Sequence, residues 1–339
     1  MTSPILRTLP MGHPWTTLDP FLFCVHHLDR YPAGNEHMGV DPQQLRGRSL
    51  GSDFSGKDGW SMYHGQQVPG FPPHPHRGFE TVTVARQGFI DHADSLGARA
   101  RFGQGDVQWM TAGRGVMHSE MFPLLSRDGD NTTELFQIWL NLPASQKMVD
   151  PHFTMLWHEQ VPVVDHFDAD GNRTRLTLIA GSFEEAQALS PPPASWASRD
   201  DAHVGIFTLE MSPGAVFELP ATDASSNRAL YFFEGQQLEI AQRTCDAPTG
   251  LELTAGAPVS LRNAGTSTAQ MLVLQGRPLG EPVVQHGPFV MNSTRQIQEA
   301  IMDYQRTQFG GWPHGTSQPV WPATQGRFAQ HVDGRLEEP

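Results

Sequence analysis

The sequence is poor in cysteine and in long apolar runs. Its 339 residues include two cysteines, Cys24 and Cys245, far apart and without a partner motif. This excludes a disulfide framework and a thiolate metal cage, and a reducing, cytoplasmic setting is expected. No apolar run approaches the ~18 residues that a membrane helix needs, and the first residues lack a basic segment followed by an apolar core. We therefore expect no membrane association.

Basic residues are also scarce, with 23 against 36 acidic residues and a formal charge of −13. Such a charge repels phosphate backbones and anionic lipid surfaces, so direct nucleic-acid binding is not expected. The chain is too long for one small core, and its length favours two domains.

Glycine and proline are abundant instead, with 33 and 28 residues, and they separate short runs rich in Val, Phe, Thr and Leu. Many short strands between turn signals predict an all-β protein of sandwiches or barrels. A helix is expected at residues 293–307, capped by Ser293 or Thr294, because apolar residues recur there at helical spacing. Polar turn residues at 162–175 predict a boundary between a domain of residues 1–165 and one of residues 166–339.

The two halves show a weak internal repeat, because strands that end on glycine recur with similar spacing in "VARQG…FGQGDVQWMTAG" and "YFFEG…LTAGAPVSLRNAG". Aligning the glycines of the two copies pairs His74, His76 and Glu80 with Ala221, Asp223 and Asn227. The same alignment pairs His118 with Gln270 and Glu120 with Leu272. No histidine survives in the second copy. Any metal is therefore expected in the first half alone.

Two histidine-bearing runs carry the chemistry. In "FPPHPHRGFETVTV", His74 and His76 stand two apart, and in "GRGVMHSEMF" His118 and Glu120 do the same. Residues i and i+2 of a strand point to one face, so each pair can reach a single point. Imidazole and carboxylate donors suit Fe(II), Mn(II), Ni(II), Cu(II), Co(II) or Zn(II), and they do not suit Ca²⁺ or copper(I).

The carboxylate of this site has two candidates. If one strand continues past His76, Glu80 lies on the same face as the histidines, together with Val82 and Val84. Glu120 is equally placed beside His118, so strand parity leaves the choice open. Apolar neighbours on the ligand face of both runs are expected if that face looks into a barrel.

Longer motifs resemble a known family. His-x-His-x-x-x-Glu with a further His some forty residues on is similar to the cupin metal signature, and "HPHRGFETVT", "HADSLG", "GDVQWMTAGRGVMHSEM" and "RTQFGGWP" resemble the pirin family of bicupins. The resemblance implies two antiparallel jelly-roll β-barrels packed together, a mononuclear iron in the first and none in the second, and a C-terminal helix and tail. It also implies the metal ligands, which are His74, His76, His118 and Glu120.

The remaining candidates surround these ligands. Glu80 is then expected either to hold a ligand imidazole by its free N–H or to be a structural carboxylate satisfied by backbone donors. Phe71 and Met62 are expected at the entrance, and Val116 and Phe122 are expected to shape the cavity. Trp109 and Met110 are pocket candidates, although aromatic and methionine residues in strands more often belong to the core. Outside the site, Arg77, Arg114 and Asp106 are expected in surface turns, and Cys24 is expected to be buried.

The resemblance implies two functions of different classes. The first is an Fe(II)-dependent dioxygenase of the quercetinase type, which cleaves a small aromatic substrate, a flavonol, with O₂, and in which Glu120 is the catalytic base. The second is a regulator whose iron senses redox state and changes a surface that binds a protein partner. A monomer is expected, because two barrels in one chain bury the surface that single-barrel cupins bury by dimerising.

Overall fold

The computed structural model describes residues 3–339, which fall into two compact units. The histidine unit comprises His26–Gln137, Ala144–Glu159 and Glu281–Pro339. The companion unit comprises the described residues up to Val25, together with Ile138–Pro143 and Gln160–Gly280. Neither unit is continuous in sequence, whereas the sequence predicts one boundary near residue 165. The polar stretch behind that prediction is the turn of a hairpin inside the companion unit, between strands β11 (Val163–Phe167) and β12 (Arg173–Ala180).

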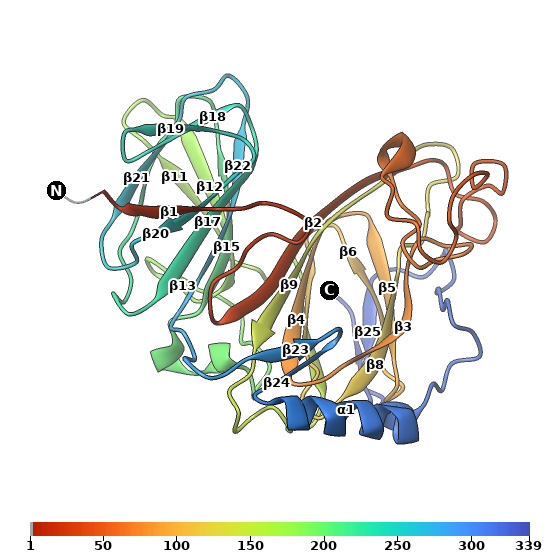
Figure 1. Cartoon of the computed structure of the whole chain (residues 1–339). Coiled ribbons are helices and arrows are strands. Elements are labelled where there is room, and N and C mark those ends of the chain that lie inside the picture. Colours follow the sequence, from red (N-terminus) through yellow and green to blue (C-terminus); the bar gives the residue numbers. More distant parts are fainter. Residues whose placement is uncertain (1–2) are drawn as a thin grey trace. The chain divides into compact units, whose positions relative to one another are not determined.

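The histidine unit is built on two antiparallel sheets (Figure 1). The five-stranded sheet has the order β10-β7-β4-β9-β2, and the six-stranded sheet has the order β26-β25-β6-β5-β8-β3. Side chains from both sheets form one apolar core. The strands of these sheets are β2 (Phe21–Tyr31), β3 (Gly70–His76), β4 (Phe79–Gln87), β5 (Phe89–Asp94), β6 (Arg99–Gly103), β7 (Val107–Thr111), β8 (Val116–Met121), β9 (Asn131–Asn141), β10 (His152–Leu156), β25 (Phe328–Gln330) and β26 (Leu336–Glu337). Residues 21–25 of β2 and 138–141 of β9 belong to the companion unit.

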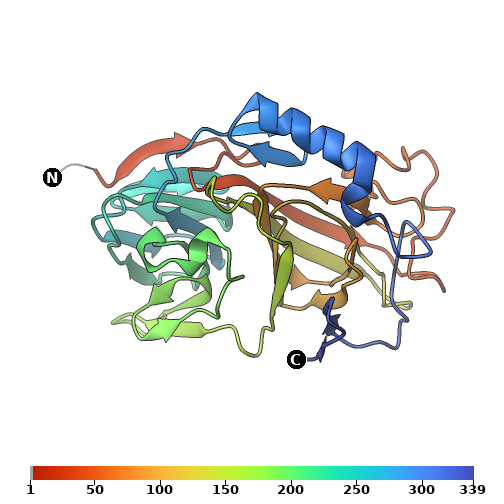
Figure 2. The same ribbon diagram turned by 90° about the horizontal axis from the view of Figure 1, so that it is seen from below.

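The C-terminal segment of the histidine unit contains the helix that the sequence predicts. Helix α1 (Thr294–Thr307) begins after Ser293, whose Oγ accepts a hydrogen bond from the Gln296 N–H at 3.3 Å. It lies alongside the hairpin of β23 (Val284–His286) and β24 (Phe289–Met291), as Figure 2 shows, and buries Ile297 and Ala300. The expected helix and its cap are confirmed. Within residues 3–339 no helix is long and apolar enough to cross a membrane.

The companion unit has a seven-stranded sheet of order β1-β20-β17-β22-β15-β12-β11 and a four-stranded sheet of order β16-β21-β18-β19. Its core is apolar throughout, and it includes Leu209, Phe232, Leu261 and Met271. The all-β class that the sequence predicts is confirmed in both units. The remaining strands are β1 (Ile5–Leu9), β13 (Ser182–Phe183), β14 (Ala186–Gln187), β15 (Gly205–Met211), β16 (Val216–Leu219), β17 (Asn227–Glu234), β18 (Gln237–Ile240), β19 (Arg243–Asp246), β20 (Thr249–Leu253), β21 (Val259–Asn263) and β22 (Ala269–Gly276).

Two charged residues that were expected in surface turns are buried. Arg77 donates to the Arg114 carbonyl at 2.6 Å and to Asp303 on α1 at 3.0 Å. Asp106 accepts hydrogen bonds from the Gly103 N–H and from Arg327 in the C-terminal segment. Both predictions are wrong for the same reason: the C-terminal segment folds back and covers these turns. Arg114 is exposed and Cys24 is fully buried, as expected.

Candidate metal centre

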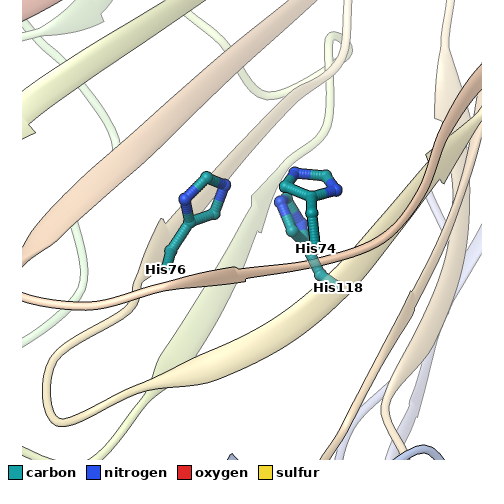
Figure 3. Close-up of side chains that lie close together, drawn as sticks. All are labelled: His74, His76 and His118. Carbon is teal, nitrogen blue, oxygen red and sulfur yellow. The ribbon is translucent and has the colours of Figure 1, made fainter. Parts of the chain in front are cut away.

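Three histidines meet where β3 pairs with β8 (Figure 3). His74 lies directly opposite His118 in the antiparallel ladder, and His76 lies opposite Val116. His74 and His76 share a face of β3 because they are two residues apart, so all three imidazoles project into the same space. Their ligand nitrogens all lie within 4.8 Å of one another. The sequence-predicted histidines are therefore brought together as a group that can hold a metal ion.

Burial keeps these imidazoles neutral. It lowers the pKa of His74 to about 4 and holds the pKa of His76 and of His118 well below the ordinary value. The nearby imidazoles add to the effect, because a positive charge on one opposes protonation of the next. Neutral imidazole is the form that binds metal, so the site suits a cation over most of the ordinary pH range.

The hydrogen bonds of the histidines leave ligand nitrogens available. The Nδ1 of His74 lies 2.9 Å from the Pro72 carbonyl, which orients the ring and leaves its Nε2 toward the group. Both ring nitrogens of His118 are buried and have no hydrogen-bond partner in the described part of the chain. A buried polar atom without a partner costs about 1–3 kcal/mol. A metal bond would remove that penalty.

Glu120 lies beside this group without being part of it. Its Oε2 is 3.8 Å from the His118 Nε2, and its Oε1 is 3.1 Å from the Thr83 hydroxyl. The same hydroxyl lies 2.7 Å from the Gln137 Oε1, and it carries only one proton. If the Gln137 amide is turned over, its NH₂ donates to Thr83 and Thr83 donates to Glu120. Burial raises the pKa of Glu120, while the electrostatic interaction with His92 and the Thr83 hydrogen bond oppose the rise.

Glu80 faces away from the histidines. It is fully buried, and its Oε1 accepts a hydrogen bond from the Thr111 hydroxyl at 2.6 Å, opposite it on β7. Three residues further along β4, on the other face, Thr83 contacts Glu120. The parity argument fails because β3 ends at His76 and a turn through Gly78, at φ 86°, starts a new strand in the other sheet. The structure thus gives Glu80 a side-chain donor, the Thr111 hydroxyl.

The predicted pocket residues divide between two environments. Phe71 lies beside His74, with ring centroids 6.2 Å apart, and Phe122 lies 6.1 Å from Phe71. Met62, Val116, Met110 and Phe122 belong to the core shared by the two sheets, and Val116 is the cross-strand partner of His76. Trp109 lies on the same face of β7 as Thr111, away from Met110, because neighbouring strand residues alternate. Its core placement is the alternative that the sequence already favours.

A cavity of about 280 Å³ opens beside the ligand strands of the histidine unit. Its lining includes the apolar residues Met110, Val116 and Phe153 and the carboxylate of Asp94. Residues of the C-terminal segment, among them His331 and Arg335, also line it. Apolar and charged side chains therefore both line this cavity.

A second group of possible ligands, Asp106, His158 and Glu159, already binds a protein cation. The guanidinium of Arg327 donates to Asp106 at 2.7 Å and lies 2.8 Å from the His158 Nδ1, and it also bonds Glu159. This group is therefore a charged anchor for the C-terminal segment and not a metal site.

Sequence reasoning missed His92 and Asp94 on β5. In the ladder between β5 and β8, His92 is the partner of Glu120 and Asp94 is the partner of His118. Both are buried, and the rings of His92 and His118 lie 5.5 Å apart. The signal was present in "HADSLG", because His92 and Asp94 repeat the i, i+2 pattern of His118 and Glu120.

The chain matches two domain models, Pirin over residues 42–140 and the Pirin C-terminal cupin domain over residues 206–310. A pirin-like protein of Solanum lycopersicum is 36% identical over 70% of this chain and 76% of its own length. A pirin-like protein of Caulobacter vibrioides is 37% identical over 71% and 80%. The crystal structure of quercetin 2,3-dioxygenase from Acinetobacter baumannii is 27% identical and covers 91% of this chain and 96% of that one, with a TM-score of 0.67.

Proposed function

This chain belongs to the pirin family, and we propose that it is an Fe(II)-dependent dioxygenase that cleaves flavonols such as quercetin with O₂. The name of the Acinetobacter baumannii protein supports this reaction class. The observation that carries the proposal is the group of three imidazoles, two of them buried and that of His74 partly buried, with the Glu120 carboxylate next to it.

The residues fit a divalent transition metal. Imidazole nitrogens and a carboxylate are donors that such ions accept, and the nitrogens of His118 have no partner among the described residues. His74, His76, His118 and Glu120 would hold the ion. The same donors accept Mn, Ni, Cu, Co or Zn, and cellular supply decides among them. A bound iron would supply Lewis acidity and redox chemistry toward O₂.

Glu120 is the group that handles the proton of the substrate. A flavonol loses the proton of its 3-hydroxyl on activation, and a carboxylate whose pKa is raised by burial is a better base than an exposed one. Glu120 takes this proton while it remains beside the ligand histidines, with its Oε1 held by the Thr83 hydroxyl and its Oε2 on the side of His118. The apolar residues Met110, Val116 and Phe153 exclude water and receive an aromatic ring of the substrate.

Oxygen uptake tests the proposal directly. Purified, iron-loaded protein should consume O₂ in the presence of quercetin and release carbon monoxide, and Glu120→Gln should abolish both. Glu80→Gln is the matched control. Glu80 is also buried, but it lies on the face of β4 that pairs with Thr111, opposite to the face from which Thr83 contacts Glu120. This variant should keep the activity. Folded, iron-loaded protein that takes up no O₂ with any flavonol would reject the dioxygenase and favour a regulator, which should then bind a specific protein differently in its ferrous and ferric states.

A further inference from the structure

The histidine unit contains a further fully buried imidazole, His92, that the proposed function leaves without a role. It projects from β5 on the same face as Asp94, because the two are two residues apart. Across the ladder, β8 presents Glu120 opposite His92 and His118 opposite Asp94. Two imidazole and carboxylate pairs thus alternate on adjoining strands, and β3 adds His74 on the far side of His118.

The nitrogens of His92 are unsatisfied. Both are buried, and neither makes a hydrogen bond to any residue from 3 to 339. Leaving a buried polar atom in this state costs about 1–3 kcal/mol, and most buried polar atoms of native proteins have a partner. A phenylalanine would fill similar space without this cost. The presence of an imidazole here therefore needs a reason other than folding.

Its surroundings fix the orientation of the His92 ring. The Asp94 Oδ2 lies 3.5 Å from the His92 Nε2, while the Asp94 Oδ1 accepts hydrogen bonds from the N–H groups of Leu96 and Ala98 at 2.9 and 3.0 Å. The carboxylate is thus held by the backbone beside the Nε2 edge of the imidazole, at an ion-pair distance and not in a hydrogen bond. The centroids of the Phe153 and His118 rings each lie 5.5 Å from the centroid of the His92 ring.

We propose that His92 is a positioning residue of the metal centre: directed by Asp94, its imidazole supports the His118 ring and the Glu120 carboxylate in the arrangement that binds the ion. The proposal rests on the ligand set of the proposed function. His92 is not itself a ligand, because the nitrogens that lie within 4.8 Å of one another belong to His74, His76 and His118. Groups behind metal ligands commonly change metal affinity 10–100-fold when they are removed.

Substitution at His92 separates positioning from structure. His92→Phe keeps an aromatic ring but removes both nitrogens, and His92→Gln places an amide nitrogen near the position of Nε2, facing Asp94. We expect His92→Phe to weaken Zn(II) binding about 10–100-fold in chelator competition. His92→Gln should lie between it and the wild type. The unfolding midpoint of metal-free His92→Phe should equal or exceed that of the wild type, because unsatisfied nitrogens are removed.

His26→Phe is the matched control in the same unit. The His26 imidazole is hydrogen-bonded to Glu134 at 3.0 Å and stacks on Phe136, so its loss should lower stability and leave Zn(II) affinity unchanged. Copper(II)-loaded protein gives a second readout, since electron paramagnetic resonance counts coordinated imidazoles. The wild type and His92→Phe should both show three.

Three results would overturn the proposal. The first is a Zn(II) affinity of His92→Phe within twofold of that of the wild type. The second is a copper(II) spectrum of His92→Phe with one coordinated imidazole fewer than the wild type. The third is an unfolding midpoint of metal-free His92→Phe below that of the wild type, as a structural role would give. Two other results would contradict the proposed ligand set itself. They are a wild type that binds no metal and a His74→Ala variant that binds metal as tightly as the wild type. Failure of the positioning role alone is therefore recognisable.

Discussion

His74 and His118 lie directly opposite each other on β3 and β8, with ring centroids 4.5 Å apart. Two ordinary properties of the sheet produce this contact, namely the register of one antiparallel ladder and the burial of its inner face. The same burial that makes the rings good ligands makes them a cost to the metal-free protein, because neither nitrogen of His118 has a partner in the described chain.

Replacing His118 by leucine should therefore stabilise the metal-free protein while abolishing its metal binding. The pKa of His118 is well below its ordinary value, so the unfolded chain takes up a proton near pH 6.5 and the folded chain does not. The wild type loses stability relative to the variant as pH falls below about 6.5, by up to ~1.4 kcal/mol per pH unit. Chemical denaturation of both proteins at pH 7.5, 6.5 and 5.5 measures this difference. Parallel stability profiles would contradict it.

The turn between β3 and β4 should tolerate no side chain. Gly78 has φ 86°, and a Cβ added there would lie 2.0 Å from the Val290 carbonyl oxygen. Gly97 has a similar φ of 93° but open space around it, so Gly97→Ala measures the conformational cost alone. We expect Gly78→Ala to lose clearly more unfolding free energy than Gly97→Ala, and to weaken metal binding because His76 ends the preceding strand. Equal losses in the two variants would show that the contact with Val290 is relieved easily.

This turn also explains how far the sequence predicts the site. The histidine pairs were identified because i, i+2 spacing on a strand is a local property, and "HPH" and "HSE" each lie within one strand. Glu80 was misplaced because strand parity is lost across Gly78, and no local pattern shows that the chain changes sheets there. His92 was overlooked because its importance comes from the ladder with β8, which is a tertiary property.

The domain organisation shows the same limit. Short strands, turns and the helix could be predicted from composition and periodicity, and they are present. The residues that follow Gly280 belong to the histidine unit because long-range contacts hold them there, and contacts between distant segments leave no periodic signal.

One such contact is a buried ion pair. Arg101 donates to both oxygens of Asp91 at 2.7 Å and to the carbonyls of Trp321, Pro322 and Gln325. Arg101→Leu leaves the buried Asp91 carboxylate without its cation, so it should lower the free energy of unfolding by about 3–5 kcal/mol. It should also make the segment around Trp321 accessible to proteases. Denaturation and limited digestion measure both effects. The matched control is Arg175→Leu, because Arg175 makes a similar two-bonded pair with Asp165 on an exposed face, worth about 0–1 kcal/mol. Similar losses in the two variants would contradict the anchoring role.

Thr83 should determine, through the pKa of Glu120, how far the pH can fall before the protein loses its metal. The hydrogen bond from Thr83 opposes the rise in the pKa of Glu120 that burial causes, so removing the hydroxyl in Thr83→Val should raise that pKa further. Because only the deprotonated carboxylate binds a cation, the pH of half-maximal Zn(II) binding should move upward. A hydrogen bond worth about 0.5–1.5 kcal/mol corresponds to a shift of up to about one pH unit. Thr81→Val is the control, since Thr81 lies two residues earlier on the same face of β4 and is equally buried. If Thr83→Val and Thr81→Val bind Zn(II) with the same pH dependence, Thr83 does not tune Glu120.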